Sequence, residues 1–222
     1  MSGRMKEYAN SILKIAASIL AVGCTGCQHE MEVMNLYQYT QHNAIDKVQE
    51  GLTIALIPRD RSQMDFYRHV AVEMEHLGGY RVSVLENIDL ADITIDIAYS
   101  CDEISDWKNF FVCMPGFLIF THAWLGYGYE YVAKWRTIAF DKNSSRKLFD
   151  APIDMKLEFR YAQLGTAWAN NFGFFYGVPA LVNGICVQFY DKWATTELIR
   201  TTEKDVARYL AHQLVLKINE NQ

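Results

Sequence analysis

The chain has 222 residues, 50% of them hydrophobic and 14% aromatic, and a formal net charge of −5 at pH 7. This length suits one domain with a substantial buried core. The acidic balance argues against partners that need a basic protein face, which are nucleic acids and anionic lipid surfaces.

The first residues have the pattern of a secretory signal. Arg4, Lys6 and Lys14 precede or border an uncharged run over 15–22, after which small residues follow. The run is much shorter than the roughly 20 apolar residues that a membrane-spanning helix needs. A basic start, a short apolar run and a small-residue exit are typical of a cleaved signal peptide. A hydrophobic amino-terminal helix with incidental thiols is the alternative.

Residues 20–24, with the sequence LAVGC, resemble a bacterial lipobox. The resemblance implies that residues 1–23 are removed and that Cys24 carries an acyl chain such as palmitate. Cys27 is the second candidate for lipidation, and an ordinary signal peptide without lipid is the alternative. In bacterial lipoproteins an aspartate after the cysteine favours the inner membrane. Thr25 therefore implies an outer-membrane anchor with the protein facing the periplasm.

Residues 24–50 are expected to form a polar tether that lets the domain clear the lipid headgroups. Apolar residues between 31 and 37 leave room for an ordered part. The start of this segment, CTGCQH, is similar to a haem-attachment site, but Gln28 breaks the required spacing. No cofactor is therefore expected.

The remaining cysteines bear on the redox compartment. Cys101 and Cys113 flank a predicted turn and are candidates for a disulfide, which an oxidising compartment permits. The alternative is that Cys113 and Cys186 are small buried apolar side chains.

A β-α-β unit is expected to open the domain. The sequence predicts a strand over 52–57, a helix over 62–77 and a second strand over 80–85. Ser62 is the predicted helix cap, and Gly79 follows the helix as a carboxy-terminal glycine should. Such units are usually parallel.

The second half of the domain is predicted to be a meander of antiparallel strands. Strands are expected over 93–99 and 127–140, a polar turn over 141–145, and further strands over 146–151 and 155–161. Apolar and polar residues alternate clearly in the first and last of these strands, which predicts one buried and one open face.

A final helix is predicted over 203–217, with Thr202 as its cap. The expected fold class is α+β, with a β-α-β start and a mixed, mostly antiparallel sheet that has two helices packed on one face. One domain over 51–222 would then follow the signal (1–23) and the tether (24–50).

Two apolar blocks interrupt this pattern, over 110–124 and 172–190. Each is predicted to be either buried core or a surface that contacts a membrane or a partner, because large apolar patches seldom face water on a monomer. The candidate contact residues are all aromatic: Phe110, Phe111, Phe117, Trp124, Phe174, Phe175 and Tyr176.

No catalytic or metal-binding motif is recognised in the sequence. Cys101 and His122 could be considered as a nucleophile and its base, but their spacing in the sequence does not support this role. The acids Asp102, Glu103 and Asp106 are better explained by a solvated loop than by a metal site. The protein is therefore expected to act without catalysis and without a bound metal.

The order of elements over 51–217, behind a lipobox, resembles small α/β periplasmic lipoproteins of secretion and envelope assembly. The comparison is with the anticodon-binding-like domain of the curli-secretion lipoprotein family and of the polysaccharide-export lipoprotein of the Pel system. Residues 115–124 also resemble uncharacterised proteobacterial lipoproteins. The resemblance implies an outer-membrane lipoprotein that acts by binding. It would be a structural or assembly component of an envelope or secretion complex, with other envelope proteins or its own copies in a ring as partners.

Two other functions stay open. A pore-forming lipoprotein would insert its glycine-rich aromatic segments into a bilayer as an oligomer. A periplasmic hydrolase or small-ligand binder would need a deep pocket lined by His122, Asp102 or Glu130.

Overall fold

The computed structural model describes residues 30–41, 51–86, 88–109, 126–142, 144–162 and 192–221. The elements in chain order are β1 (Met31–Val33), α2 (Tyr37–Thr40), β2 (Thr53–Pro58), the 3-10 turn η1 (Arg61–Gln63), α3 (Met64–Gly78), β3 (Arg81–Val84), the 3-10 turn η2 (Ile88–Leu90), β4 (Ile93–Ser105), β5 (Tyr127–Asp141), β6 (Arg146–Tyr161) and α8 (Lys192–Asn221).

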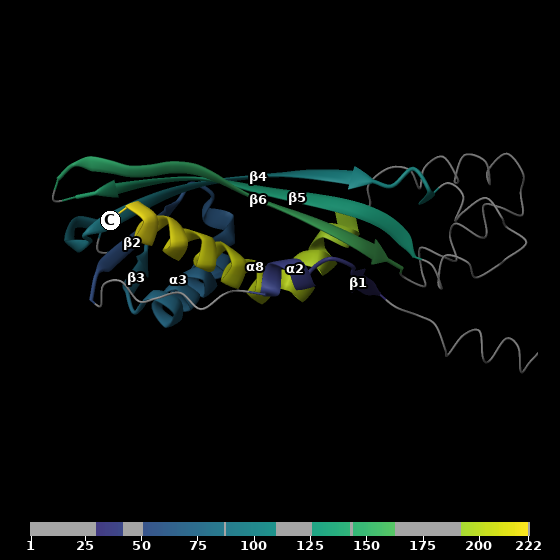
Figure 1. The fold of residues 1–222 in the computed structure, drawn as a ribbon. Helices are drawn as coiled ribbons and strands as arrows, with labels where there is room; N and C mark the ends of the chain where they lie inside the picture. The colour runs from purple at the N-terminus through teal and green to yellow at the C-terminus, as the bar shows by residue number, and fades with distance from the viewer. Residues whose placement is uncertain are drawn as a thin grey trace, which may run out of the picture. The chain divides into compact units, whose positions relative to one another are not determined.

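The strands form one sheet in the order β1-β6-β5-β4-β2-β3. Helices α3 and α8 lie against the same face of this sheet (Figure 1). The predicted α+β class, with helices packed on one face of a mixed sheet, is confirmed.

The chain divides into two compact units. The larger unit comprises Val33–Ile104, Glu130–Phe159 and Lys192–Gln222. The smaller unit comprises the other residues, and its described part contains the buried side chain of Asn109. The Oδ1 atom of Asn109 accepts from the Gly128 N–H at 2.8 Å, and its Nδ2 atom donates to the Gly128 carbonyl at 2.9 Å.

The predicted β-α-β unit is present and parallel. Strand β2 pairs in parallel with β3 on one side and with β4 on the other. Helix α3 ends where Gly79 adopts a left-handed φ of 71° and donates its N–H to the Glu75 carbonyl at 3.0 Å. The predicted cap at the other end is wrong. Asp60 accepts from the backbone N–H of Ser62 and starts the turn η1, so the α-helix begins only at Met64.

The second half of the sheet is antiparallel. The Lys142 N–H donates to the carbonyl of Asp92, the residue before the start of β4, and Asp102 farther along β4 pairs with Lys134 of β5. Residue numbers thus rise along β4 while those of their partners fall, as in an antiparallel pair. Strands β5 and β6 form a hairpin through the predicted polar turn, where Ser145 has a left-handed φ of 52°. The two strands predicted over 146–151 and 155–161 are one continuous strand, β6.

Residues 30–41 protect the free edge of β6. The Met34 N–H donates to the Glu158 carbonyl at 2.8 Å, which extends the pairing of β1. Beyond β1 the side chain of Asn35 bonds the Lys156 carbonyl at 2.8 Å and the Glu158 N–H at 2.9 Å. The Tyr39 hydroxyl also bonds both backbone groups of Lys156. An edge covered in this way is not open to pairing with another chain. This part of the segment that was expected to be a tether is therefore ordered.

Helix α8 is much longer than predicted. It begins at Lys192, and Thr202 lies buried within it instead of capping it. The Thr202 hydroxyl donates to the Leu198 carbonyl one turn earlier, at 2.7 Å. A threonine inside a helix often makes this bond. The pattern from Thr202 to Asp205 imitates a capping box, but the buried stripe continues upstream through Leu198 and Ala194.

Candidate functional site: an aromatic cavity

A cavity of about 320 Å³ lies in the larger unit. Residues of β4, β5 and β6 line it on the sheet side, and residues of η1, α3 and α8 line it on the helix side. Ligand sites in proteins typically enclose about 300–1,000 Å³ and are mostly apolar. The cavity therefore has the size of a small-molecule site.

The alternation of β5 creates the floor of this cavity. Tyr131, Ala133 and Trp135 occupy successive inward positions, and all three are buried and line the cavity. The side chains of a strand alternate between its two faces, so these residues share one face. Because Ala133 is small, it leaves space between two large aromatic neighbours. Leu157 of β6 completes the apolar floor.

Aromatic rings form one wall. The indole of Trp135 is stacked with the ring of Phe66 of α3, with centroids 6.4 Å apart and planes 12° from parallel. Tyr99 of β4 packs against the same indole at 5.8 Å, with its plane tilted by 38°. These separations are in the range in which aromatic pairs contribute favourably. The wall therefore holds its shape through contacts between three separate elements.

The hydroxyl groups of Tyr99 and Tyr131 are hydrogen-bonded to each other. Burial raises the pKa of Tyr99 far above its ordinary value, and the bond to Tyr131 raises it further. Burial also raises the pKa of Tyr131, although its bond to Tyr99 acts in the opposite direction. Both groups therefore remain neutral at physiological pH. They form a small polar spot in an otherwise apolar wall.

Two carboxylates lie at the helix side of the cavity. Asp65 stands in the first turn of α3 and pairs with Arg68 at 2.8 Å, while Glu203 of α8 contacts His69 Nδ1 at 3.3 Å. Neither Arg68 nor His69 lines the cavity. Among the residues that line it in the described part of the chain there is no lysine, arginine or histidine. The lining is thus mainly apolar and aromatic, with the polar residues Ser62, Gln63 and Thr202 and no basic residue, and each of its two acids contacts a basic side chain outside the lining.

Two buried polar atoms lie in this region. Trp135 Nε1 and the Tyr67 hydroxyl are buried and have no hydrogen-bond partner among the described residues. Buried polar groups are nearly always hydrogen-bonded, and leaving one unpaired costs about 1–3 kcal/mol.

The predicted lipidation and contact residues fall outside the part of the chain that the structure describes. These are Cys24, Cys27, Phe110, Phe111, Phe117, Trp124, Phe174, Phe175 and Tyr176. Cys101 is exposed on β4, and its predicted disulfide partner Cys113 also lies outside the described residues, as does His122.

Of the three acidic residues expected in a solvated loop after Tyr99, Asp106 lies beyond the end of β4, where its Oδ1 atom accepts from the Lys108 N–H at 2.9 Å, but the other two do not lie in a loop. Asp102 and Glu103 belong to β4, which continues to Ser105. Asp102 pairs with Lys134 at 2.5 Å, and Glu103 accepts from the Thr195 hydroxyl of α8 at 2.7 Å. The strand is longer than predicted because its pairing with β5 continues after its apolar alternation has ended.

Two residues considered for a ligand pocket are absent from the lining of this cavity. Asp102 and Glu130 both form ion pairs elsewhere on the sheet, the latter with Lys156 at 3.0 Å. The aromatic residues that do line the cavity were not singled out by the sequence patterns. The alternation of Tyr131, Ala133 and Trp135 is visible in the sequence and could have indicated an aromatic floor with a gap.

Neither a metal centre nor a membrane-spanning helix is found in the described ranges. Within them no group of three or more His, Cys, Asp or Glu side chains is arranged to hold a metal ion. The helices of those same ranges include none that is both long and apolar enough to cross a membrane.

No protein-family model matches this chain, and no curated protein sequence matches it. Among solved structures, it is similar to a neuraminyllactose-binding hemagglutinin homolog from Helicobacter pylori, with 9% identity, coverage of 74% of this chain and 95% of that chain, and a TM-score of 0.32. Rare lipoprotein B from Shewanella oneidensis is 8% identical, with coverage of 67% of this chain and 98% of that chain and a TM-score of 0.31. A chain of a PelC dodecamer from Paraburkholderia phytofirmans is 8% identical, with coverage of 71% of this chain and 96% of that chain and a TM-score of 0.26. Likenesses at these TM-scores carry no conclusion about this chain, so its function has to be argued from its own geometry.

Proposed function

We propose that this protein is a lipid-anchored lipoprotein of the bacterial envelope that acts by binding, and that the aromatic cavity is its binding site. The observation that carries the proposal is the cavity itself, with its volume of about 320 Å³ and its aromatic lining. The cavity opens to solvent on its helix side, where the Asp65 side chain is exposed, so a small molecule can enter it. A mostly apolar cavity of this size is the typical form of a small-molecule site, which supports the proposal.

The anchor is supported by the lipobox sequence at 20–24. Glu30 accepts a hydrogen bond from the Ala162 N–H at 3.0 Å. Six residue steps separate Cys24 from Glu30, and an extended chain of that length reaches at most about 20 Å. An acyl chain on Cys24 would thus hold this end of β6 close to the membrane surface, in the outer-membrane and periplasmic location that Thr25 implies.

The finer role in this proposal is that of a structural or assembly component of an envelope complex. The apolar blocks 110–124 and 172–190, which would contact partner proteins or other copies of this chain, lie outside the described residues. An apolar side chain of such a partner is one occupant that the cavity could accept.

The cavity is tested with a full chain that carries Cys24→Ser, which removes the proposed acylation site. The probe is the neutral dye N-phenyl-1-naphthylamine, whose fluorescence rises in apolar sites. We expect Ala133→Leu to fill the gap in the floor and to reduce saturable dye binding. Val132→Leu, on the next residue and the other face of β5, is the matched control.

Equal dye binding by both variants, each with a native circular dichroism spectrum, would contradict the assignment of the site. The anchor is tested separately in cells. The chain with Cys24 intact should incorporate labelled palmitate and sediment with outer membranes, and Cys24→Ser should do neither. A soluble wild-type chain without the label would contradict the lipoprotein assignment.

A further inference from the structure

We propose that the ligand of the aromatic cavity is an organic cation with an apolar body, such as an aryl or alkyl ammonium group. This inference rests on the proposed function, because it names the ligand class of the same site. It comes from a juxtaposition that the sequence patterns do not reveal: aromatic side chains, from α3, β4 and β5, and two acidic residues, from α3 and α8, line one cavity.

The aromatic wall supplies the first half of the recognition. The rings of Phe66, Tyr99 and Trp135 are held in contact with one another and line the cavity together. The face of an aromatic ring carries partial negative charge, and it attracts a cation placed within about 6 Å of its centre, most strongly for tryptophan. Such a wall accepts both the apolar body and the charge of an ammonium ligand.

The carboxylates supply the second half. Glu203 comes from α8 and Asp65 from α3, so the two acids approach the cavity from different helices. The Asp65–Arg68 pair is largely exposed, with side-chain exposures of 86% and 65%, and exposed pairs are weak and easily exchanged. The Glu203 side chain is less exposed, at 30%. We therefore expect Glu203 to make the larger contribution to binding a cation.

The same lining argues against other ligand classes. A fatty acid or another apolar anion would meet two carboxylates and no basic side chain among the described lining residues. A sugar would need many polar partners, but the lining is mainly apolar, the Tyr99 and Tyr131 hydroxyls are bonded to each other, and the Ser62 and Thr202 hydroxyls donate to Asp60 and Leu198. A metal ion would need several clustered ligands, and none of the described residues form such a group.

Isothermal titration calorimetry on the full chain with Cys24→Ser tests this inference. The probes are phenyltrimethylammonium, its neutral isostere tert-butylbenzene, and the anion phenylacetate, all at physiological salt. We expect phenyltrimethylammonium to bind about five- to tenfold more tightly than tert-butylbenzene, and phenylacetate to bind more weakly than either.

Variants separate the carboxylates from general effects of charge. Glu203→Gln should weaken phenyltrimethylammonium binding about five- to tenfold and leave tert-butylbenzene binding unchanged. Asp65→Asn should act in the same direction with a smaller effect, and it serves as the second variant if Glu203→Gln does not fold. Glu158→Gln, on the open face of β6, is the matched control and should change neither affinity.

The outcomes distinguish this inference from the proposed function. If tert-butylbenzene binds as tightly as the cation, and does so in an Ala133→Leu-sensitive way, the cation inference is overturned while the binding function stands. If Glu203→Gln and Glu158→Gln have the same effect on the cation, the inference is also overturned. If no probe binds, both the inference and the cavity as a binding site are rejected.

Discussion

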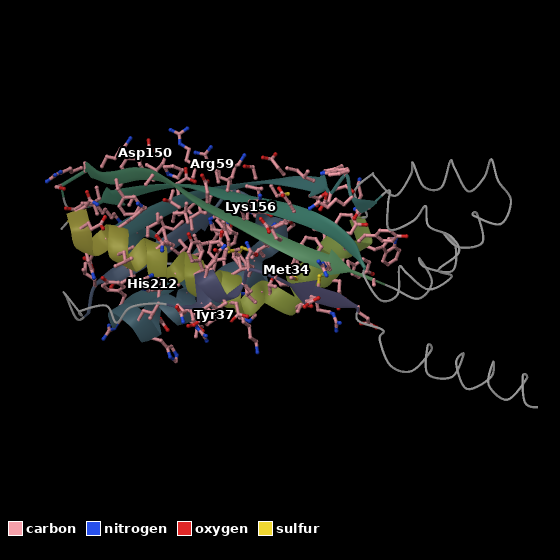
Figure 2. All side chains as sticks on the ribbon, turned by 45° about the vertical axis from the view of Figure 1, so that its right-hand side comes forward. Met34, Tyr37, Arg59, Asp150, Lys156 and His212 are labelled. Atoms are coloured by element: carbon pink, nitrogen blue, oxygen red, sulfur yellow. The ribbon has the colours of Figure 1, made fainter. Side chains whose placement is uncertain are left out.

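The two faces of β6 have opposite roles although they alternate residue by residue. Phe159 points into the core and is 1% exposed. The preceding side chain, Glu158, is 54% exposed and forms an ion pair with Lys156 at 3.4 Å. Figure 2 shows Arg59 and Asp150 on the side of the sheet away from the helices, whereas His212 lies on the helix side, in α8. The inner face therefore buries apolar surface and shapes the cavity, and the open face carries ion pairs that water can replace.

The comparison shows how unequal adjacent residues can be in their energetic contribution. Removing apolar surface from water stabilises the fold by roughly 25 cal/mol per Å². An exposed ion pair contributes about 0–1 kcal/mol, because water and salt screen it. Stability should thus depend on the inner face almost alone, although the open face has more charged contacts.

The largest expected effect comes from changing the inner face. Phe159→Ala removes a buried aromatic ring and should lower the free energy of unfolding by about 3–5 kcal/mol. Glu158→Ala, one residue away on the open face, should lower it by less than about 1 kcal/mol. Urea denaturation followed by circular dichroism measures both. Similar losses for the two variants would show that the two faces are not as different as their burial indicates.

A smaller effect should appear at alkaline pH. The pKa values of Tyr99 and Tyr131 are raised by burial, so the folded protein keeps their protons where an unfolded tyrosine, with a pKa of about 10, would lose them. Their contribution to stability is complete below pH of about 10 and is lost as pH rises toward the higher folded values. We expect the free energy of unfolding of Tyr131→Phe, measured by urea denaturation, to fall less steeply with pH than that of the wild type between about pH 9 and pH 11.

The control for the alkaline prediction is Tyr37→Phe, since the Tyr37 side chain is exposed and lies away from the sheet (Figure 2). This variant should keep the wild-type dependence of unfolding on pH. If Tyr131→Phe keeps it as well, the hydroxyls of the cavity wall do not control alkaline stability.

The smallest effect concerns the open face at acid pH. Hydrogen bonds from Arg136 and Lys147 lower the pKa of Asp150 to about 2. The stabilisation from this lowered pKa is present above the unfolded value of about 4 and is lost as pH falls through about 2. The urea midpoint of the wild type should therefore fall slightly as pH is lowered from about 4 to about 2, and Asp150→Asn should lack this part of the decrease. Asp154→Asn, on the same strand, controls for the loss of a carboxylate.

Titration of the Asp150 carboxyl by nuclear magnetic resonance gives a direct measurement. A midpoint near the ordinary aspartate value, in wild-type protein, would mean that the ion pairs of the open face are not formed in solution. The contrast between the faces would then be larger than the structure indicates.

Much of the fold could be predicted because its signals are local. Alternation over 155–161 predicted a strand with one buried face, Gly79 predicted the end of α3, and the polar residues before Ser145 predicted the hairpin turn. The signals failed at boundaries. The residues from Thr202 to Asp205 match a capping pattern, which predicts a helix start, while the burial of Thr202 inside α8 depends on contacts with distant residues.

The sequence by itself determined the periods of the strands and helices, the class of fold and the amino-terminal signal pattern, since each depends on neighbouring residues along the chain. Only the tertiary structure decided the candidate site. The gap above Ala133 becomes a cavity because Phe66, Trp135 and Leu198 come from three elements that are far apart in sequence and do not fill it. The volume left between side chains depends on the arrangement of all of them, and no local pattern encodes it.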